Sequence, residues 1–517
     1  MRKFLYVIVF ISGMVSLAVE FAASRLLGNY FGTSNLVWAS IVGLILIYLT
    51  AGYFIGGAWA DKSPKHETLY KILSWAALAV ALIPLTSRPI LRLASNAFDE
   101  LQLGALVGSF VAVMVLFIIP VTLIGTASPF AIRLAITDTQ QAGKVSGRIY
   151  AISTLGSFTG TFLPTLLLIP TIGTYRTFLV LASLLMLFSF IGFFITSGWR
   201  KLLPYVWMPL VIAALFLWGV PGTDKNTTGL VYETESSYNY IQVIEHNDNM
   251  FLRLNEGQGV HSRYTADQLF FNGPWEQVVA APFFNSAPVA PEQITDIAII
   301  GLAAGTTARD AAVVFPNAVI DGIEIDPKIV EVGREYFDMN DPNLNVIIQD
   351  GRWGIQNSTK KYDIISVDAY RPPYIPWHMT TQEFFQILKD HLKDNGVMVI
   401  NIGRGIDDRR LIDSLYTTIH TVFPSLYVTD LSGSFNSILF ATNTETNLQN
   451  FLDNYVILNE DQETNQFLLG VMATTYSGLQ ETANDGIIFT DDLAPIEGIT
   501  NSMIMQFLFS GDVETLE

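Results

Sequence analysis

Long apolar segments dominate the first 220 residues of the chain, and each is long enough to span a lipid bilayer. The first is too long, and too closely followed by others, to be a cleaved signal peptide. The pattern predicts an α-helical multi-pass domain with about seven transmembrane helices, placed in the cell membrane. The seven segments are Phe4–Leu27, Leu36–Trp59, Leu69–Ser87, Gly104–Gly125, Ile149–Thr171, Thr174–Thr196 and Leu202–Val220.

Shorter patterns follow residue 222. Apolar and polar positions alternate between Leu230 and His261, which predicts β-hairpins, and Asp267–Ala281 has the spacing of a helix. The strands expected after residue 294 are Ile297–Ile300, Ala318–Ile323, Asn345–Gln349, Tyr362–Val367, Val397–Ile402, Leu426–Thr429 and an antiparallel Phe435–Ala441. The helices expected between them are Thr307–Val314, Pro327–Phe337, Thr381–Leu392 and Asp408–Val422. This alternation predicts an α/β domain with a doubly wound, mostly parallel sheet.

These patterns divide the chain into four parts. Residues 1–221 form the membrane domain, and residues 222–290 form a linker and a small β-hairpin subdomain. Residues 291–460 form a Rossmann-like domain, and residues 461–517 form a tail that completes the catalytic domain.

Charge separates the two halves. Residues 1–221 contain 14 Lys and Arg against 6 Asp and Glu, whereas residues 222–517 contain 15 against 41. The acidic second half disfavours nucleic acid as a partner and favours cationic ligands. The chain has no cysteine, and its 6 histidines form no HxxxH pattern, so no metal site is predicted.

The basic residues of the loops predict a cytoplasmic N-terminus. Seven spans then place residues 222–517 outside the cytoplasm. The loop Gly57–Lys62 is similar to the GxxxD[RK] loop of major-facilitator transporters, which keeps a transport role open as well.

One stretch of the second half predicts a nucleotide site. The strand Ile297–Ile300 ends in a small-residue loop that contains Gly301 and Gly305, and the next strand ends in Glu324 and Asp326. In doubly wound sheets, such a loop lets the backbone approach a ligand, and the acid binds ribose hydroxyls. The ligand expected here is an adenosine-containing cofactor. Such a cofactor is expected in the cytoplasm, whereas seven spans place this half of the chain outside it, and the sequence leaves this conflict open.

The next two strand ends add further polar groups. Asp350 and Gly351 follow the third strand, and Asp368 and Tyr370 follow the fourth. Right-handed crossovers bring these ends to one edge of the sheet. A carboxylate such as Asp368, at the mouth of an apolar strand, is suited to general-base catalysis or to holding a cation.

The second half resembles the spermidine synthase-like aminopropyltransferases, in the form that follows a multi-pass membrane region. The motifs that support the resemblance are Ser237–Val243, Leu254–Gln258, Gly301–Thr306, Gly322–Asp326, Gln349–Arg352, Tyr362–Asp368 and Phe489–Glu497. The resemblance implies a class I methyltransferase-type fold, polyamine biosynthesis, a possible homodimer, and an amine or polyamine substrate.

The resemblance also assigns roles to the residues. Decarboxylated S-adenosylmethionine would lie over the Gly-loop, with its ribose on Glu324 and its adenine near Asp350 and Gly351. The side of this S-adenosyl donor that carries the aminopropyl group would lie near Gln258. Asp368 matches the catalytic aspartate, and Tyr370 could contribute to a wall around a polyamine.

Three positions differ from the residues that are usual in the family, and they leave the type of reaction open. Ala304 stands where the family has an aspartate, Arg371 follows Tyr370 where a second aspartate is usual, and Asp267 stands in place of a tyrosine. The donor could therefore be S-adenosylmethionine, with methyl transfer as the reaction and Arg371 or Arg309 pairing with its carboxylate. Other readings are a lipid acceptor presented by the membrane half, or a transporter or sensor that binds polyamine or nucleoside without chemistry.

Overall fold

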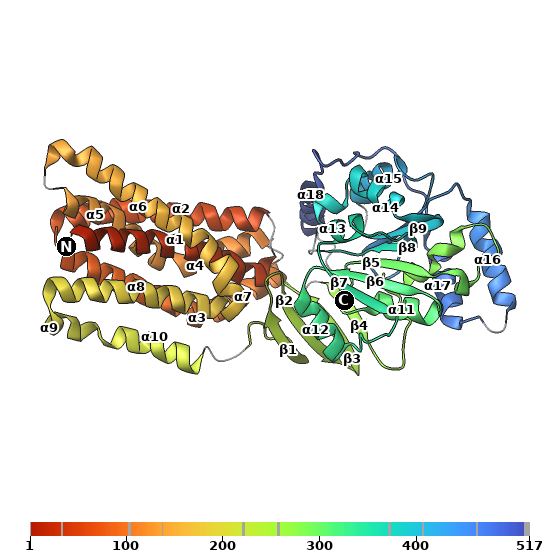
Figure 1. The fold of residues 1–517 in the computed structure, drawn as a ribbon, viewed down its shortest axis with the longest axis horizontal. Coiled ribbons are helices and arrows are strands. Elements are labelled where there is room, and N and C mark those ends of the chain that lie inside the picture. Colours follow the sequence, from red (N-terminus) through yellow and green to blue (C-terminus); the bar gives the residue numbers. More distant parts are fainter. Residues whose placement is uncertain are drawn as a thin grey trace. The chain divides into compact units, whose positions relative to one another are not determined.

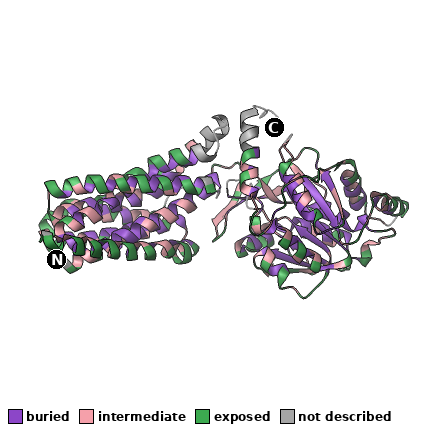
Figure 2. Cartoon of the chain, turned by 90° about the horizontal axis from the view of Figure 1, so that it is seen from above, coloured by how far each residue is buried: buried purple, intermediate pink, exposed green. Residues whose placement is uncertain are grey.

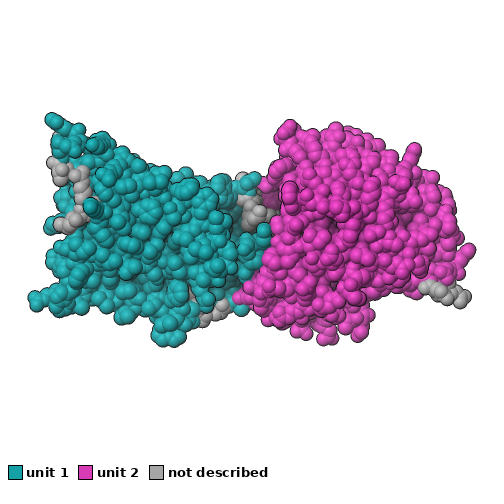
Figure 3. Space-filling model, viewed as in Figure 1, with its two compact units in different colours: residues 1–227, 235–239 teal, residues 228–234, 240–517 magenta. Residues whose placement is uncertain are grey.

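A computed structural model describes residues 2–32, 35–101, 105–136, 138–219, 223–255, 259–370, 374–405, 408–461 and 464–510. The chain forms two compact units, which Figure 3 shows in different colours. The first unit comprises residues 1–227 with 235–239, and the second comprises residues 228–234 with 240–517.

The first unit is a bundle of helices that lie side by side (Figure 1). Its helices are α1 (Arg2–Phe31), α2 (Asn35–Lys62), α3 (His66–Leu101), α4 (Ala105–Gly125), α5 (Ala127–Ala135), α6 (Ala142–Phe162), α7 (Ile169–Ile172), α8 (Thr174–Ser197), α9 (Trp199–Leu202) and α10 (Trp207–Trp218). A π-helical turn, Leu163–Leu168, follows α6, and 3-10 turns lie at Thr139–Gln141 and Leu203–Tyr205.

Six helical stretches of the described residues are long and apolar enough to cross a membrane. The seventh predicted segment is a pair of helical stretches, Trp199–Tyr205 and Trp207–Trp218, bent by 47°. Pro204 and Pro209 lie in this segment, and each lacks the backbone N–H that a regular helix needs. The number of spans is therefore six, or seven if the bent pair is one span.

Small residues let the helices of the bundle approach closely. A Cβ atom added to Gly156 of α6 would lie 2.1 Å from the carbonyl oxygen of Phe10 in α1. One added to Gly52 of α2 would lie 2.4 Å from the carbonyl oxygen of Thr122 in α4. Close backbone contact through small residues is the usual way in which helices associate in lipid.

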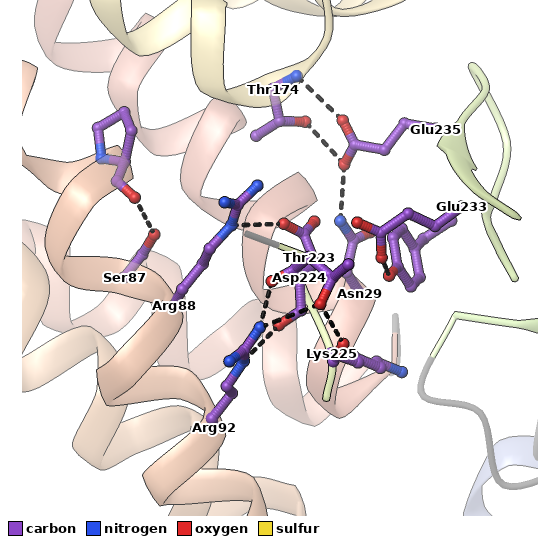
Figure 4. Close-up of polar contacts among 12 residues, drawn as sticks. Asn29, Ser87, Arg88, Arg92, Thr174, Thr223, Asp224, Lys225, Glu233 and Glu235 are labelled. Atoms are coloured by element: carbon purple, nitrogen blue, oxygen red, sulfur yellow. Dashed lines mark hydrogen bonds and ion pairs between the residues drawn. The ribbon is translucent and has the colours of Figure 1, made fainter. Parts of the chain in front are cut away.

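One end of the bundle holds a cluster of polar contacts (Figure 4). Arg88 donates from Nε to Oδ1 of Asp224 over 2.9 Å, and Arg92 donates to the backbone carbonyl of Asp224 over 2.9 Å. Glu235 accepts hydrogen bonds from the backbone N–H and the hydroxyl of Thr174 at the start of α8. Asp224 and Glu235 are thus bonded to α3 and to the start of α8.

A small sheet and a large sheet form the second unit. The small sheet is antiparallel, with strand order β1 (Leu230–Glu235), β2 (Tyr240–His246), β3 (Asn249–Leu254) and β4 (Val260–Tyr264). The large sheet has eight strands in the order β12-β10-β11-β9-β8-β5-β6-β7. Its strands are β5 (Asp296–Ile300), β6 (Val319–Glu324), β7 (Leu344–Ile348), β8 (Tyr362–Val367), β9 (Leu392–Gly403), β10 (Ser425–Asp430), β11 (Asn436–Thr442) and β12 (Leu479–Gln480).

The large sheet is Rossmann-like and mixed. Strands β7, β6, β5, β8 and β9 are parallel, and β11 runs antiparallel between β9 and β10, as expected for Phe435–Ala441. The chain reverses its winding between β5 and β8, and ligands bind outside the carboxyl ends of the strands at such a point.

Helices cover both faces of the large sheet. The core of one face includes α11 (Thr306–Val314), α16 (Leu448–Glu460), α17 (Gln466–Ser477) and the 3-10 helix Glu276–Phe284. The core of the other face includes α13 (Gly351–Gln356), α14 (Gln382–Asp390), α15 (Arg410–His420) and α18 (Ile496–Ser510). Helix α12 (Pro327–Tyr336) packs against the small sheet. The strands inside the unit are largely buried, whereas the helices around them have exposed outer faces (Figure 2).

The prediction of an α-helix over Asp267–Ala281 is wrong in both the position and the type of the helix. Residues 266–275 are not helical, and a 3-10 helix runs from Glu276 to Phe284. Asn272 has a positive φ of 56°, and the Glu276 carboxylate accepts from the backbone N–H groups of Phe271 and Gly273. These local bonds satisfy the backbone in a turn instead of a helix.

Candidate functional site

The Gly-loop after β5 needs glycine at both predicted positions. Gly301 has φ +86°, and a Cβ atom there would lie 2.4 Å from the carbonyl oxygen of Asp368. Gly305 has φ +89° at the N-cap of α11, and a Cβ atom there would lie 2.5 Å from Cγ of Met339. A side chain is excluded at both positions by backbone conformation and by space. The loop is therefore pressed against the end of β8.

Glu324, at the end of β6, holds this loop in place. Its carboxylate accepts hydrogen bonds of 3.0 Å from the backbone N–H groups of Ala303 and Asp326. Only 7% of the residue is exposed, and burial raises the pKa of its carboxyl group to about 7. The structure thus brings the predicted acid and the Gly-loop into direct contact.

Asp326 and Asp350 have the geometry of helix N-caps. Asp326 accepts from the backbone N–H of Lys328 at the start of α12, and it is fully buried. Asp350 accepts from the backbone N–H of Trp353 in α13, and its other oxygen lies 3.2 Å from Nε2 of His378. The hydrogen bond with His378 lowers the pKa of Asp350.

Gly351 follows Asp350 where the chain passes close to β5. A Cβ atom at Gly351 would lie 2.4 Å from Cγ2 of Ile300, the last residue before the Gly-loop. Asp350 and Gly351 therefore lie at the same edge of the sheet as Glu324 and the loop, as the crossover rule predicted.

Asp368 follows β8 at the centre of this edge. Its backbone N–H donates to the carbonyl of Ile300, and its Oδ1 accepts a hydrogen bond of 2.9 Å from Nδ2 of Asn401. Burial raises the pKa of its carboxyl group to about 6, and the bond from Asn401 opposes this rise. A small cavity opens on Asp368, lined also by Pro274, Val278, Thr307, Ser366, Val367, Val399, Asn401 and Ile438.

The Tyr370 hydroxyl is engaged with the backbone of β9. It accepts from the N–H of Gly403 over 2.6 Å and donates to the carbonyl of Asn401 over 3.2 Å. Burial and the charge of Asp368 raise its pKa. Tyr370 therefore fixes the strand end that presents Asn401 to Asp368.

Sequence reasoning missed Asn401, His378 and a contact of the C-terminal tail. Asn401 is the polar residue near the end of an apolar strand, and that position was the available signal. Arg352 makes a bidentate pair with Asp491, with both distances 2.7 Å, and also donates to the carbonyl of His378. The tail is thereby bonded to the segments around Asp350.

Other residues considered for the site lie elsewhere. Gln258 and Arg371 are outside the described residues. Arg309 donates to the backbone carbonyls of Thr265 and Ala266 and stacks on a tyrosine ring. Asp267 is exposed on a loop. Ala304 is buried and donates from its backbone N–H to the hydroxyl of Ser262 in β4.

No cluster of three or more potential metal ligands was found among the residues that the structure describes. The polar groups at the edge are carboxylates, amides, the Tyr370 hydroxyl, the His378 imidazole and backbone groups. Such groups can orient a nucleoside and an amine and can accept a proton.

Comparison with known proteins points to one family. Residues 283–450 match the model of the spermine/spermidine synthase domain. A probable polyamine aminopropyl transferase of Bifidobacterium longum is 32% identical over 294 residues, which cover 54% of this chain and 64% of that protein. The polyamine aminopropyltransferase of Vibrio vulnificus is 30% identical over 212 residues, which cover 38% of this chain and 66% of that protein. The matches thus span slightly less than two thirds of either relative's length.

A second kind of relative is a methyltransferase. The human eEF1A lysine and N-terminal methyltransferase is 31% identical over 155 residues, which cover 28% of this chain and 22% of that protein. Among solved structures, a probable spermidine synthase of Corynebacterium glutamicum aligns with a TM-score of 0.38 and 20% identity, over 51% of this chain and 98% of that chain. The spermidine synthase of Thermotoga maritima aligns with a TM-score of 0.39 and 19% identity, over 48% and 84%.

Proposed function

Because this chain carries a spermidine synthase-like domain, we propose that it is a membrane-bound transferase that moves an aminopropyl group from decarboxylated S-adenosylmethionine to an amine. The amine nitrogen attacks the aminopropyl carbon next to the sulfonium sulfur. The carbon–sulfur bond breaks, its electron pair goes to sulfur, and methylthioadenosine leaves. The new secondary ammonium group releases a proton during or after the attack.

The single observation that supports this reaction best is the environment of Asp368. Its carboxylate opens on a small cavity, and its pKa of about 6 leaves it ionised at neutral pH. A base with a pKa below the working pH and close to it accepts a proton efficiently. Asn401 holds the carboxylate through Oδ1, which leaves Oδ2 for the amine. Asp368 is the proposed catalytic base, and Tyr370 is proposed to act by positioning Asn401.

The proposed S-adenosyl site is the Gly-loop with the ends of β6 and β7. Gly301 and Gly305 keep side chains away from the loop, and Glu324 is fixed by two backbone N–H groups beside it. Asp350 and Gly351 lie at the next strand end. Asp326 would act indirectly, as the N-cap that holds the start of α12. Gln258 completes the proposed set by resemblance alone. These groups fit a nucleoside, which is bound by carboxylates on hydroxyl groups and by backbone close to the base.

Methyl transfer from S-adenosylmethionine is the second candidate. The observation in its favour is Ala304, which is buried and apolar where an aminopropyltransferase loop has an acid for the amine of its co-substrate. The human methyltransferase match is consistent with this reading. The acceptor in either case is proposed to be an amine, and a polyamine is the first choice because the second half of the chain is acidic.

We further propose that the helical unit inserts into the cell membrane as a multi-pass domain and that the second unit is the catalytic domain, with no metal and no nucleic acid. The helices of the first unit meet the length and hydropathy of membrane spans. The divisions at residues 221, 290 and 460 and a homodimer remain expectations from the sequence and from the resemblance.

Product analysis tests the proposal directly. The purified full-length chain in detergent is incubated with decarboxylated S-adenosylmethionine or S-adenosylmethionine, and with putrescine, spermidine or ethanolamine. Mass analysis that finds methylthioadenosine and an aminopropylated amine supports the first function. Adenosylhomocysteine with a methylated amine supports the second. If wild type and Asp368→Asn both bind the nucleoside and neither forms product, the chain is a binding protein.

A further inference from the structure

The charged side chains of the first unit fall at the two ends of its helices. One end, called the basic end, holds the start of α1 and the connections α2–α3, α5–α6 and α8–α9. There Lys201 lies 2.9 Å from Glu67, Arg133 lies 2.9 Å from Asp61, and Arg148 stacks on Tyr6. This end carries ten Lys and Arg: Arg2, Lys3, Lys62, Lys65, Lys71, Arg133, Lys144, Arg148, Arg200 and Lys201.

The opposite end, called the linker end, holds the ends of α1 and α3, the start of α8, and residues 223–225. It carries five basic residues: Arg25, Arg88, Arg92, Arg176 and Lys225. Arg25 donates to the backbone carbonyls of Ser236 and Tyr238, and Arg88 and Arg92 hold Asp224 (Figure 4). Most of the positive charge at this end is therefore bonded to the chain itself.

The bent pair α9–α10 connects the two ends. Lys201, before the bend, pairs with Glu67 at the start of α3, and Asp224, after α10, pairs with Arg88, 13 residues before the end of α3. Glu67 and Arg88 are 21 positions apart on one helix, which corresponds to roughly 30 Å at the helical rise per residue. That length is about the thickness of the hydrocarbon core of a bilayer.

From Lys201 to Asp224 the chain thus covers the same distance across the bundle as α3 does from Glu67 to Arg88, which makes the bent pair a seventh crossing instead of a re-entrant loop. The first crossing, α1, begins at the basic end, where Arg148 stacks on Tyr6, and ends where Arg25 bonds to Ser236. Seven crossings then bring residue 223 to the linker end.

From these contacts we infer that the catalytic unit lies on the non-cytoplasmic side of the membrane. Loops rich in Lys and Arg stay in the cytoplasm, so the basic end is cytoplasmic. The chain leaves the bundle at the other end, and no candidate span occurs among the described residues after Trp218. The inference rests on the proposed membrane insertion, and it deepens the proposed function, because the amine and the S-adenosyl co-substrate must then be met outside the cytoplasm.

Cysteine labelling tests the inference, and the natural chain offers a background without cysteine. Single cysteines are placed at Lys361 and Glu445, which are exposed in the second unit, and at Gln140, which is exposed at the basic end. Spheroplasts that express each full-length variant receive a membrane-impermeant maleimide before or after lysis. Labelling in detergent measures the total amount of reactive cysteine, and carbonate extraction tests whether the chain is inserted in the membrane.

The expected result is near-total labelling of Lys361→Cys and Glu445→Cys in intact spheroplasts, and labelling of Gln140→Cys only after lysis. The reverse pattern would place the catalytic unit in the cytoplasm and overturn the inference, as would labelling of all three only after lysis. A chain released by carbonate would overturn its premise of membrane insertion. The labelling experiment does not depend on enzyme activity, and the product analysis in detergent does not depend on the orientation of the chain in the membrane. Failure of this inference can therefore be distinguished from failure of the proposed reaction.

Discussion

Asn401 donates a hydrogen bond of 2.9 Å from its side-chain nitrogen Nδ2 to Oδ1 of Asp368. The bond favours the ionised carboxylate, whereas burial favours the protonated form and raises the pKa of Asp368 to about 6. Asp368 directly follows β8, and Asn401 lies near the end of the neighbouring parallel strand β9. The Tyr370 hydroxyl fixes the backbone at Asn401.

Replacing Asn401 by leucine should move the acid limb of the pH–activity profile upward. Wild type should lose kcat/KM as the pH falls through about 6, because Asp368 becomes protonated there. Without the hydrogen bond, the pKa should rise by roughly one to two units, since a bond to a charged group contributes about 1.5–3 kcal/mol. Activity at pH 9 should be affected least. A limb that stays at its wild-type position would show that Asn401 does not act through Asp368.

Replacing Asp368 by asparagine should remove activity and yet stabilise the fold above pH 7. A carboxyl group whose pKa is raised by folding stabilises the native state while it is protonated, and this contribution is lost as the pH rises from about 4 to 6. The neutral amide avoids the loss, which is worth on the order of 1–3 kcal/mol. Thermal melting of both proteins at pH 4 and pH 8 should show a clearly larger gain for Asp368→Asn at pH 8. An equal shift at both pH values would contradict a buried charge.

The sequence predicted seven of the eight strands of the large sheet, because each of these is a short apolar run followed by polar residues or glycine. It missed β12, which is only two residues long. Because Glu324 and Asp368 stand at the ends of two of these apolar runs, the sequence also predicted the edge of the sheet at which they lie. Asn401 and His378 were missed, because their importance lies in partners that are far away in the sequence, Asp368 and Asp350. The hydrophobic pattern also cannot distinguish a helix from the turn that the Glu276 carboxylate stabilises. Nor can it distinguish a straight membrane span from the bent pair α9–α10.

Glu324 and Asp326 are close in sequence but should differ in function. Glu324→Gln should weaken binding of the S-adenosyl compound, because the amide –NH₂ cannot accept from the backbone N–H of Ala303 or Asp326. Asp326→Ala removes an N-cap of α12 and should lower stability by about 1 kcal/mol with little effect on affinity. Isothermal titration and thermal melting of both variants measure the two effects. Equal affinity losses would indicate that Asp326 also contacts the ligand.

Arg352 should be intolerant of lysine. The guanidinium bonds both oxygens of Asp491 and the carbonyl of His378, a geometry that an ammonium group cannot reproduce. Arg352→Lys should therefore expose the tail after residue 480 to limited proteolysis and should lower activity through His378 and Asp350. A matched control is Arg334→Lys, because Arg334 is an exposed residue in the last turn of α12. Equal protease sensitivity of both variants would refute a special role of the Arg352 pair.

The Gly-loop gives the sharpest test of the site geometry, because one methyl group should disrupt it. Gly301→Ala forces an unfavourable backbone conformation at φ +86°, which costs about 1–3 kcal/mol. It also places Cβ 2.4 Å from the carbonyl oxygen of Asp368, so the loop and the base must move apart.

Gly470 of α17 is the control, since a Cβ atom there meets no atom within 4 Å, and alanine should raise helix stability by about 1 kcal/mol. Melting temperature should fall for Gly301→Ala and rise for Gly470→Ala. Activity should be lost in the first variant even where it is fully folded, because the distance between the loop and Asp368 sets the alignment of the two substrates. A folded, fully active Gly301→Ala would mean that the S-adenosyl compound does not bind against this loop.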